Sequence, residues 1–159
     1  MASRPTGTTF SGKRPAAGSA PASGALESAL KAIQLDHTIV PARDRVQSAR
    51  FFSRIFGIHF DEAKAGHFAP VHVNEVLILD FCDSERPSSH HYAFRVSESE
   101  FDDIVGRIQA EGIAYGSSPF SRDDRTVDTR GGGRRVYFDD PSGHVLEILT
   151  VPWERSAGA

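Results

Sequence analysis

The sequence contains little cysteine, little net charge and no long apolar run. Its one cysteine, Cys82, cannot form a disulfide within the chain and is compatible with a reducing compartment. The net charge of -3 gives no electrostatic reason to expect binding to nucleic acid or to an anionic membrane surface. Because no apolar stretch approaches the roughly 20 residues that cross a bilayer, we expect no membrane-spanning helix. These absences favour a cytoplasmic protein without nucleic-acid or membrane partners.

The beginning of the chain differs in composition from the rest. Residues 1–26 are rich in Ser, Ala, Gly, Pro and Thr, and the first acidic residue of the chain is Glu27. Such a segment buries too little apolar surface to offset the loss of chain entropy, so we expect a disordered tail. Its basic composition also fits a transit peptide, although an amphipathic arginine stripe is missing. We expect a short helix over 25–33, one domain over 27–152 and a C-terminal tail over 153–159.

From Leu35 onward the chain runs through one plan of elements twice. Each copy opens with a strand that carries a histidine, His37 in the first copy and His91 in the second. A helix with apolar residues at helical spacing follows in both copies. These helices are expected to end at Gly57 and Gly112, at nearly the same interval from the histidine. The matched intervals favour a true structural repeat.

Both copies continue into short strands, and the last strand of each is apolar: Val76 to Phe81 in the first copy and Val145 to Thr150 in the second. The pattern predicts an α+β fold of paired βαβββ modules that form a cupped mixed sheet with the helices outside. Module one is expected over about 34–83 and module two over about 90–152. Because few residues are identical between the copies, two unrelated α+β halves remain the alternative.

Glu147 lies in a strand, Val145 to Leu149, that is apolar on both faces and is therefore expected to be buried. An ionised carboxylate there is costly unless a cation or several donors compensate it. If first and last strands lie side by side, His37, His91 and Glu147 converge on one divalent metal, with Fe(II) or Mn favoured and Ni, Co or Zn as alternatives. Taken singly, each histidine is also consistent with a hydrogen-bonded residue of the core, and Glu147 is consistent with a carboxylate that pairs with an arginine from a loop. The other histidines, among them His144, are expected in turns or at the surface.

Three segments resemble the vicinal-oxygen-chelate superfamily, and the resemblance covers about residues 34 to 152. They are Leu35 to Val40, His91 to Phe94, and Val136 to Glu147, which includes an Asp-Pro-Ser-Gly-His turn. The superfamily contains glyoxalase I, fosfomycin-resistance thiol transferases, extradiol dioxygenases and bleomycin-binding proteins.

The resemblance implies a metal-dependent enzyme that acts on a small oxygen-bearing molecule. It places the metal ligands at His37, His91 and Glu147, and the catalytic Tyr137 on the same cavity. It also implies a homodimer in which His37 of one chain could meet His91 and Glu147 of the partner chain.

Departures from the family patterns distinguish the possible reactions. Glyoxalase I has a fourth ligand, a carboxylate, at a place where counting along the repeat puts Ile78, with Asp80 two residues on and on the same face. Extradiol dioxygenases have an acid/base histidine at a position that most nearly matches Thr129. Fosfomycin thiol transferases need cations for a phosphonate, and five arginines lie in a plausible loop: Arg122, Arg125, Arg130, Arg134 and Arg135.

We therefore expect dioxygenase-like chemistry first, with a glyoxalase-type lyase or a fosfomycin-type thiol transferase as alternatives. A metal-free small-molecule binding protein of the bleomycin-resistance type is an alternative from a different class. The substrate pocket is expected to include Asp80, Thr129, Arg130 and Arg134.

Overall fold

The computed structural model describes residues 33–152 of the 159-residue chain. The expected tails, and nearly all of the helix expected over 25–33, lie outside the described residues. The chain divides into two units, and the second, Leu35–Ala159, contains the elements described below. Within the described part of the chain, no helix is long and apolar enough to cross a membrane.

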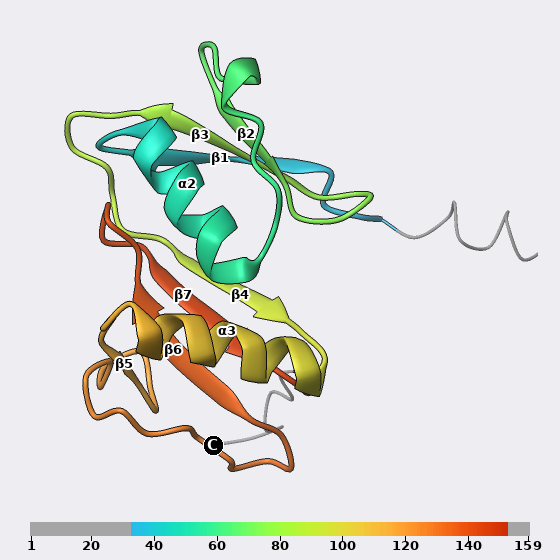
Figure 1. The fold of residues 1–159 in the computed structure, drawn as a ribbon, viewed down its shortest axis with the longest axis vertical. Coiled ribbons are helices and arrows are strands. Elements are labelled where there is room, and N and C mark those ends of the chain that lie inside the picture. The colour runs from blue at the N-terminus through green and yellow to red at the C-terminus, as the bar shows by residue number, and fades with distance from the viewer. Residues whose placement is uncertain (1–32, 153–159) are drawn as a thin grey trace, which may run out of the picture. The chain divides into compact units, whose positions relative to one another are not determined.

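Module one is a 3-stranded sheet in the order β1-β3-β2 with one helix against it (Figure 1). Its elements are β1 (His37–Ala42), α2 (Arg45–Phe56), β2 (Ala69–His72) and β3 (Ile78–Asp83). β1 and β3 run parallel, whereas β2 and β3 run antiparallel. The expected further strand between α2 and β2 is replaced by a 3-10 turn, η1 (Glu62–Lys64). This turn forms because the Asp61 carboxylate accepts from the Ala63 N–H, and Glu, Ala and Lys are good helix formers.

Module two is a 4-stranded sheet in the order β4-β7-β6-β5 with one helix (Figure 1). Its elements are β4 (His91–Arg95), α3 (Glu98–Ala110), β5 (Tyr115–Gly116), β6 (Arg135–Asp139) and β7 (Val145–Leu149). The Ser97–Glu100 capping box begins α3. The predicted α+β class with mixed sheets is confirmed. Within one chain, however, the strands form two separate sheets, and β1 and β4 are both edge strands.

The two modules share a hydrophobic core. Because residues alternate between the two faces of each strand, one face of each sheet is apolar and packs toward the helices. On β4, Phe94 turns toward the helices, and its ring lies 5.3 Å from that of Phe52 and 5.1 Å from that of Phe56. Helix α2 of module one therefore packs against β4 of module two. The other faces of the two sheets, which carry His37 and His91, remain open; we call them the open faces.

His144 directly follows a turn, as expected, but it is fully buried and joins the modules at a second place. Its Nδ1 accepts from the backbone N–H of His90 at 3.1 Å, and its Nε2 lies 2.7 Å from the carbonyl oxygen of Pro41. These two partners select the neutral ring with hydrogen on Nε2. The ring thus links the turn before β7 to strand β1.

We expect His144→Ala to lower the free energy of unfolding by about 2–4 kcal/mol, because it leaves a cavity and removes the partners of two partly buried backbone groups. Urea denaturation of the full chain measures this loss. The exposed His59 provides the control, since His59→Ala should change stability by less than about 0.5 kcal/mol. Equal losses in the two variants would contradict the linking role of His144.

Candidate functional site

Glu147 is the centre of a polar cluster on the open face of module two. Its side chain lies between β4 and β6, and the residue is 4% exposed. One carboxylate oxygen, Oε2, lies 2.9 Å from Nε2 of His91, and the other, Oε1, accepts a hydrogen bond from the Tyr137 hydroxyl at 3.1 Å. The carboxylate that the sequence predicts to be buried is therefore compensated by an imidazole and a phenol.

The His91–Glu147 pair fits a divalent metal by its chemistry and its spacing. Two ligands that each lie about 2.1 Å from a metal ion, at a right angle to one another, are separated by about 3 Å. The 2.9 Å between His91 Nε2 and Glu147 Oε2 is close to this value. The His91 side chain is 44% exposed, so the pair is open to an ion from the solvent side.

Tyr137 stays protonated beside the carboxylate. Burial, followed by the negative charge of Glu147, raises the pKa of Tyr137 to about 12. A neutral phenol is the form that donates to Glu147, so the ionisation state and the hydrogen bond are consistent. Tyr137 holds one oxygen of Glu147 while the other faces His91.

Module one presents a second pair, His37 and Asp80, on its own open face. In module two, Glu147 lies opposite Ala93, two residues after His91; in module one, Asp80 lies opposite Ile39, two residues after His37. Asp80 therefore has the position in module one that Glu147 has in module two. We call His91 with Glu147, and His37 with Asp80, the two half-sites.

Counting along the repeat placed Ile78 at the position in module one that corresponds to Glu147, and this assignment is wrong. Ile78 lies opposite His37 itself. The count failed because the side chain of Asn74 accepts from the backbone N–H groups of Val76 and Leu77, which makes a turn of the residues expected to begin the strand. Strand β3 consequently starts two residues later than expected, and Asp80 takes the acidic position.

His37 is oriented by its neighbour. Its Nδ1 lies 2.8 Å from Oδ2 of Asp36, and its side chain is 59% exposed. The hydrogen bond with Asp36 raises the pKa of His37, and the negative charge of Asp80 raises it further. An imidazole held through Nδ1 keeps Nε2 available, which is the usual arrangement of a histidine that ligates a metal.

A single chain does not bring the three predicted ligands together. Among residues 33–152, no group of three or more His, Cys, Asp or Glu residues could hold a metal ion. The expected convergence of His37 with His91 and Glu147 is thus not found within the chain. His37 lies on the edge strand β1 of one sheet, whereas His91 and Glu147 lie on β4 and β7 of the other.

The expected pocket residues other than Asp80 are divided between the two sides of the sheet. Arg134 lies on the helix side, where its guanidinium contacts Glu98 and Asp102 and lies 4.4 Å from the centre of the Phe101 ring. Arg130 is exposed and paired with Asp128, and Thr129 is exposed beside it.

Arg135 was expected among the loop arginines, but it begins strand β6, and sequence reasoning missed its place beside Tyr137. Because it precedes Tyr137 by two residues on β6, Arg135 shares the open face, whereas Arg134 does not. Its side chain is 13% exposed, and it forms a hydrogen bond with the Tyr137 side chain. The alternation of side chains along β6 was the available signal.

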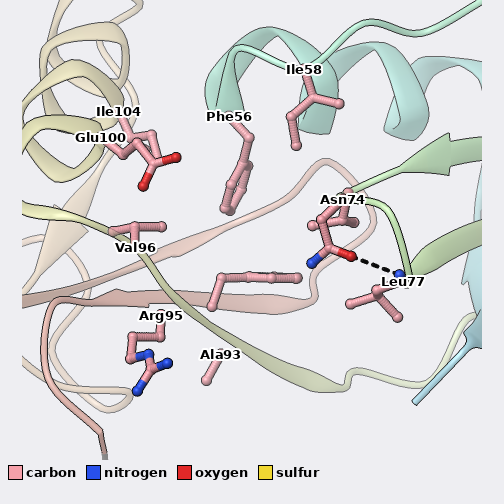
Figure 2. Close-up of a pocket in the computed structure, with 11 residues that line it drawn as sticks. Phe56, Ile58, Asn74, Leu77, Ala93, Arg95, Val96, Glu100 and Ile104 are labelled. Carbon is pink, nitrogen blue, oxygen red and sulfur yellow. Dashed lines mark hydrogen bonds between the residues drawn. The ribbon is translucent and has the colours of Figure 1, made fainter. Parts of the chain in front are cut away.

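A cavity of about 380 Å³ lies beside β4, and Ala93 and Arg95 of that strand contribute to its lining (Figure 2). Phe56 and Ile58 line it from module one, and Glu100 and Ile104 line it from α3. Neither His91 nor Glu147 is among its lining residues. The chemistry of the half-sites belongs to the open faces, which lack a cover within the described part of one chain.

Comparison with known proteins relates the chain to a large superfamily. The family model described as "Glyoxalase/Bleomycin resistance protein/Dioxygenase superfamily" matches residues 34–148. The solved structures of Oxidase ChaP-H2 and Oxidase ChaP-H1 are each 43% identical to this chain, with TM-scores of 0.72. The first similarity covers 79% of this chain and 98% of that chain, and the second covers 78% and 100%.

Two further similarities are more limited. Metallothiol transferase FosB of Shouchella clausii (strain KSM-K16) is 35% identical over 65 residues, 41% of this chain and only 40% of that relative's length. The structure of the fosfomycin resistance protein FosX from Mesorhizobium loti has a TM-score of 0.55 at 18% identity, covers 77% of this chain and 93% of that chain, and supports the fold alone.

We expect Tyr137 to remain un-ionised at a pH where an ordinary tyrosine has titrated. The tyrosinate absorbance of the wild type minus that of Tyr137→Phe should stay flat up to about pH 11, because the pKa of Tyr137 is raised to about 12. Ultraviolet titration, with circular dichroism to verify folding, measures the difference. A step centred near about pH 10 would show that Tyr137 is neither desolvated nor beside a charged Glu147.

Proposed function

The chain belongs to the Glyoxalase/Bleomycin resistance protein/Dioxygenase superfamily, and from this premise we propose that it is a metal-dependent enzyme with oxidase- or dioxygenase-like chemistry. Its substrate is a small molecule with two neighbouring oxygen atoms. The observation that carries the proposal is the buried Glu147, whose oxygens meet His91 and Tyr137 on an open face.

The two half-sites together would hold the metal. His91 and Glu147 provide one imidazole and one carboxylate, and His37 provides the second imidazole. Asp80 is the proposed fourth donor because of its register equivalence to Glu147. Mixed imidazole and carboxylate donors suit Fe(II) or Mn, and also Ni, Co or Zn. A metal bound there supplies Lewis-acid polarisation of the substrate oxygens.

The half-sites are proposed to meet between two copies of the chain. Within residues 33–152, β1 and β4 each have one edge without a neighbouring strand, and the exposed side chains of Leu35 and Ile39 lie at or just before β1. An exposed edge with apolar residues favours pairing with another strand. In a two-fold homodimer, module one of each protomer would cover module two of its partner, and each dimer would contain two equivalent sites.

The chain's own groups have distinct roles in this arrangement. Asp36 orients His37, and Tyr137 orients Glu147 through a hydrogen bond. The Tyr137 phenol is protonated at neutral pH, and its single proton is donated either to Glu147 or, in exchange, to a substrate oxygen. Covering the open face excludes water and strengthens these contacts.

The oxidase-like reaction is preferred because the two oxidase structures match this chain at 43% identity over nearly their whole length. Thiol transfer is the second candidate, supported by the identity to FosB over 65 residues. A metal-free binding protein is the third candidate. It is less favoured because it assigns no ligand-binding role to the pair of His91 and Glu147. We propose a cytoplasmic location, in keeping with the single cysteine.

We expect metal to bind at about one ion per chain, and His37→Ala and Glu147→Ala each to abolish binding. Mixing the two variants after reversible unfolding should restore about one quarter of the wild-type sites, because half of the dimers are hybrids with one intact site each. Elemental analysis and oxygen consumption measure the recovery. Two Glu147→Ala preparations mixed with each other provide the control.

If the mixture recovers nothing while both variants remain folded dimers, the site is not shared between chains. If wild-type protein purified without chelators contains no metal and binds none on addition, the enzyme proposal is wrong.

The reaction is tested by comparing co-substrates. With Fe(II), we expect oxygen uptake in the presence of a catechol panel, and no glutathione consumption with fosfomycin or methylglyoxal. An oxygen electrode and a thiol assay measure the two. Glutathione consumption without oxygen uptake would replace the oxidase-like proposal with the transferase or lyase alternative.

A further inference from the structure

The open face of module two extends beyond Glu147 into a row that contains two arginines. Leu149 follows Glu147 by two residues on β7 and lies opposite Arg95 on β4 and Arg135 on β6. Since residues two apart share a face, all three point to the side of His91 and Tyr137. We call this row, one step of about 7 Å along the strands from Glu147, the arginine row.

Arg135 is held in place by several partners. Its Nε lies 3.6 Å from a carboxylate oxygen of the buried Asp128, and a terminal nitrogen donates to the carbonyl oxygen of Arg130 at 2.9 Å. A further hydrogen bond joins its side chain to that of Tyr137. A largely buried guanidinium fixed in this way is a pre-organised cation beside Tyr137, the residue that donates to Glu147.

Arg95 differs because no carboxylate within residues 33–152 lies within ion-pair distance of it. It is exposed, and Figure 2 shows its side chain pointing away from Glu100 and Ile104. Around the row, two carboxylates, those of Asp128 and Glu147, are outnumbered by the three guanidinium groups of Arg95, Arg130 and Arg135. The row therefore has an excess of positive charge, whereas the whole chain has a net charge of -3.

We propose that Arg95 and Arg135 form an anion subsite, which selects substrates that carry an ionised oxygen group, such as a carboxylate, in addition to the two oxygens that face His91 and Glu147. This inference rests on the proposed function. Guanidinium groups bind carboxylates through paired, charge-assisted hydrogen bonds, and a cation fixed before binding loses little freedom when the anion arrives.

Two probes that differ in one carboxylate test the proposal. Catechol and 3,4-dihydroxybenzoate present the same neighbouring hydroxyls, and the second carries a carboxylate across the ring. Isothermal titration of the metal-loaded full chain should show that 3,4-dihydroxybenzoate binds about ten- to a hundredfold more tightly. Arg95→Gln should reduce this gain about tenfold while changing the affinity for catechol less than about twofold.

Matched variants keep the test decisive. Arg50→Gln removes a cation from the exposed Arg50–Glu62 pair on α2 and should preserve the full gain. Because Arg135 is largely buried, Arg135→Lys is measured beside Arg135→Gln, with thermal unfolding of each; the lysine variant keeps the charge and should retain part of the gain.

Equal affinities of the wild type for the two probes would overturn the anion subsite and leave the proposed function standing. A gain that persists in Arg95→Gln would also overturn it. If neither probe binds to the metal-loaded protein, the proposed function itself fails, and the subsite fails with it.

Discussion

The structure depends on the compensation of one carboxylate in an apolar strand. Glu147 is the central polar group of a sheet whose neighbouring residues on β7 are buried, and burial of an unpaired charge there would cost several kcal/mol. His91 and Tyr137 compensate it from the two flanking strands. The same arrangement leaves two donor atoms at a spacing suited to a metal ion, so the group that the fold must stabilise is also the group that gives the open face its chemistry.

The shared core explains why each open face carries only half of the proposed metal site. The aromatic cluster around Phe94 draws α2 onto β4, and the ring of His144 links the turn before β7 to β1. Both contacts bury the helix sides of the sheets and leave the open faces without a cover. The half-site of His37 and Asp80 therefore needs a counterpart from outside its own chain, which is the physical basis of the proposed homodimer.

The α+β class, the repeated helices and the burial of Glu147 could be predicted because each depends on local periodicity or on a single strand. The position of Asp80 could not be counted correctly, because a side-chain turn at Asn74 moved the start of β3. His144 was expected in a turn, but its burial was not predicted, because a turn sequence does not reveal which backbone groups of a distant strand need a partner. Arg135 was hidden among loop arginines until the register of β6 was known.

The central claim is that the half-sites of two chains meet on one metal ion. A crystal structure of the full chain loaded with Fe(II) or Mn, with data collected at the metal's absorption edge, tests it most directly. The account predicts one anomalous peak per chain, in contact with His91 and Glu147 of one protomer and with His37 of its partner. A peak bound by His91 and Glu147 without any second imidazole, or no peak at this face, would contradict the account.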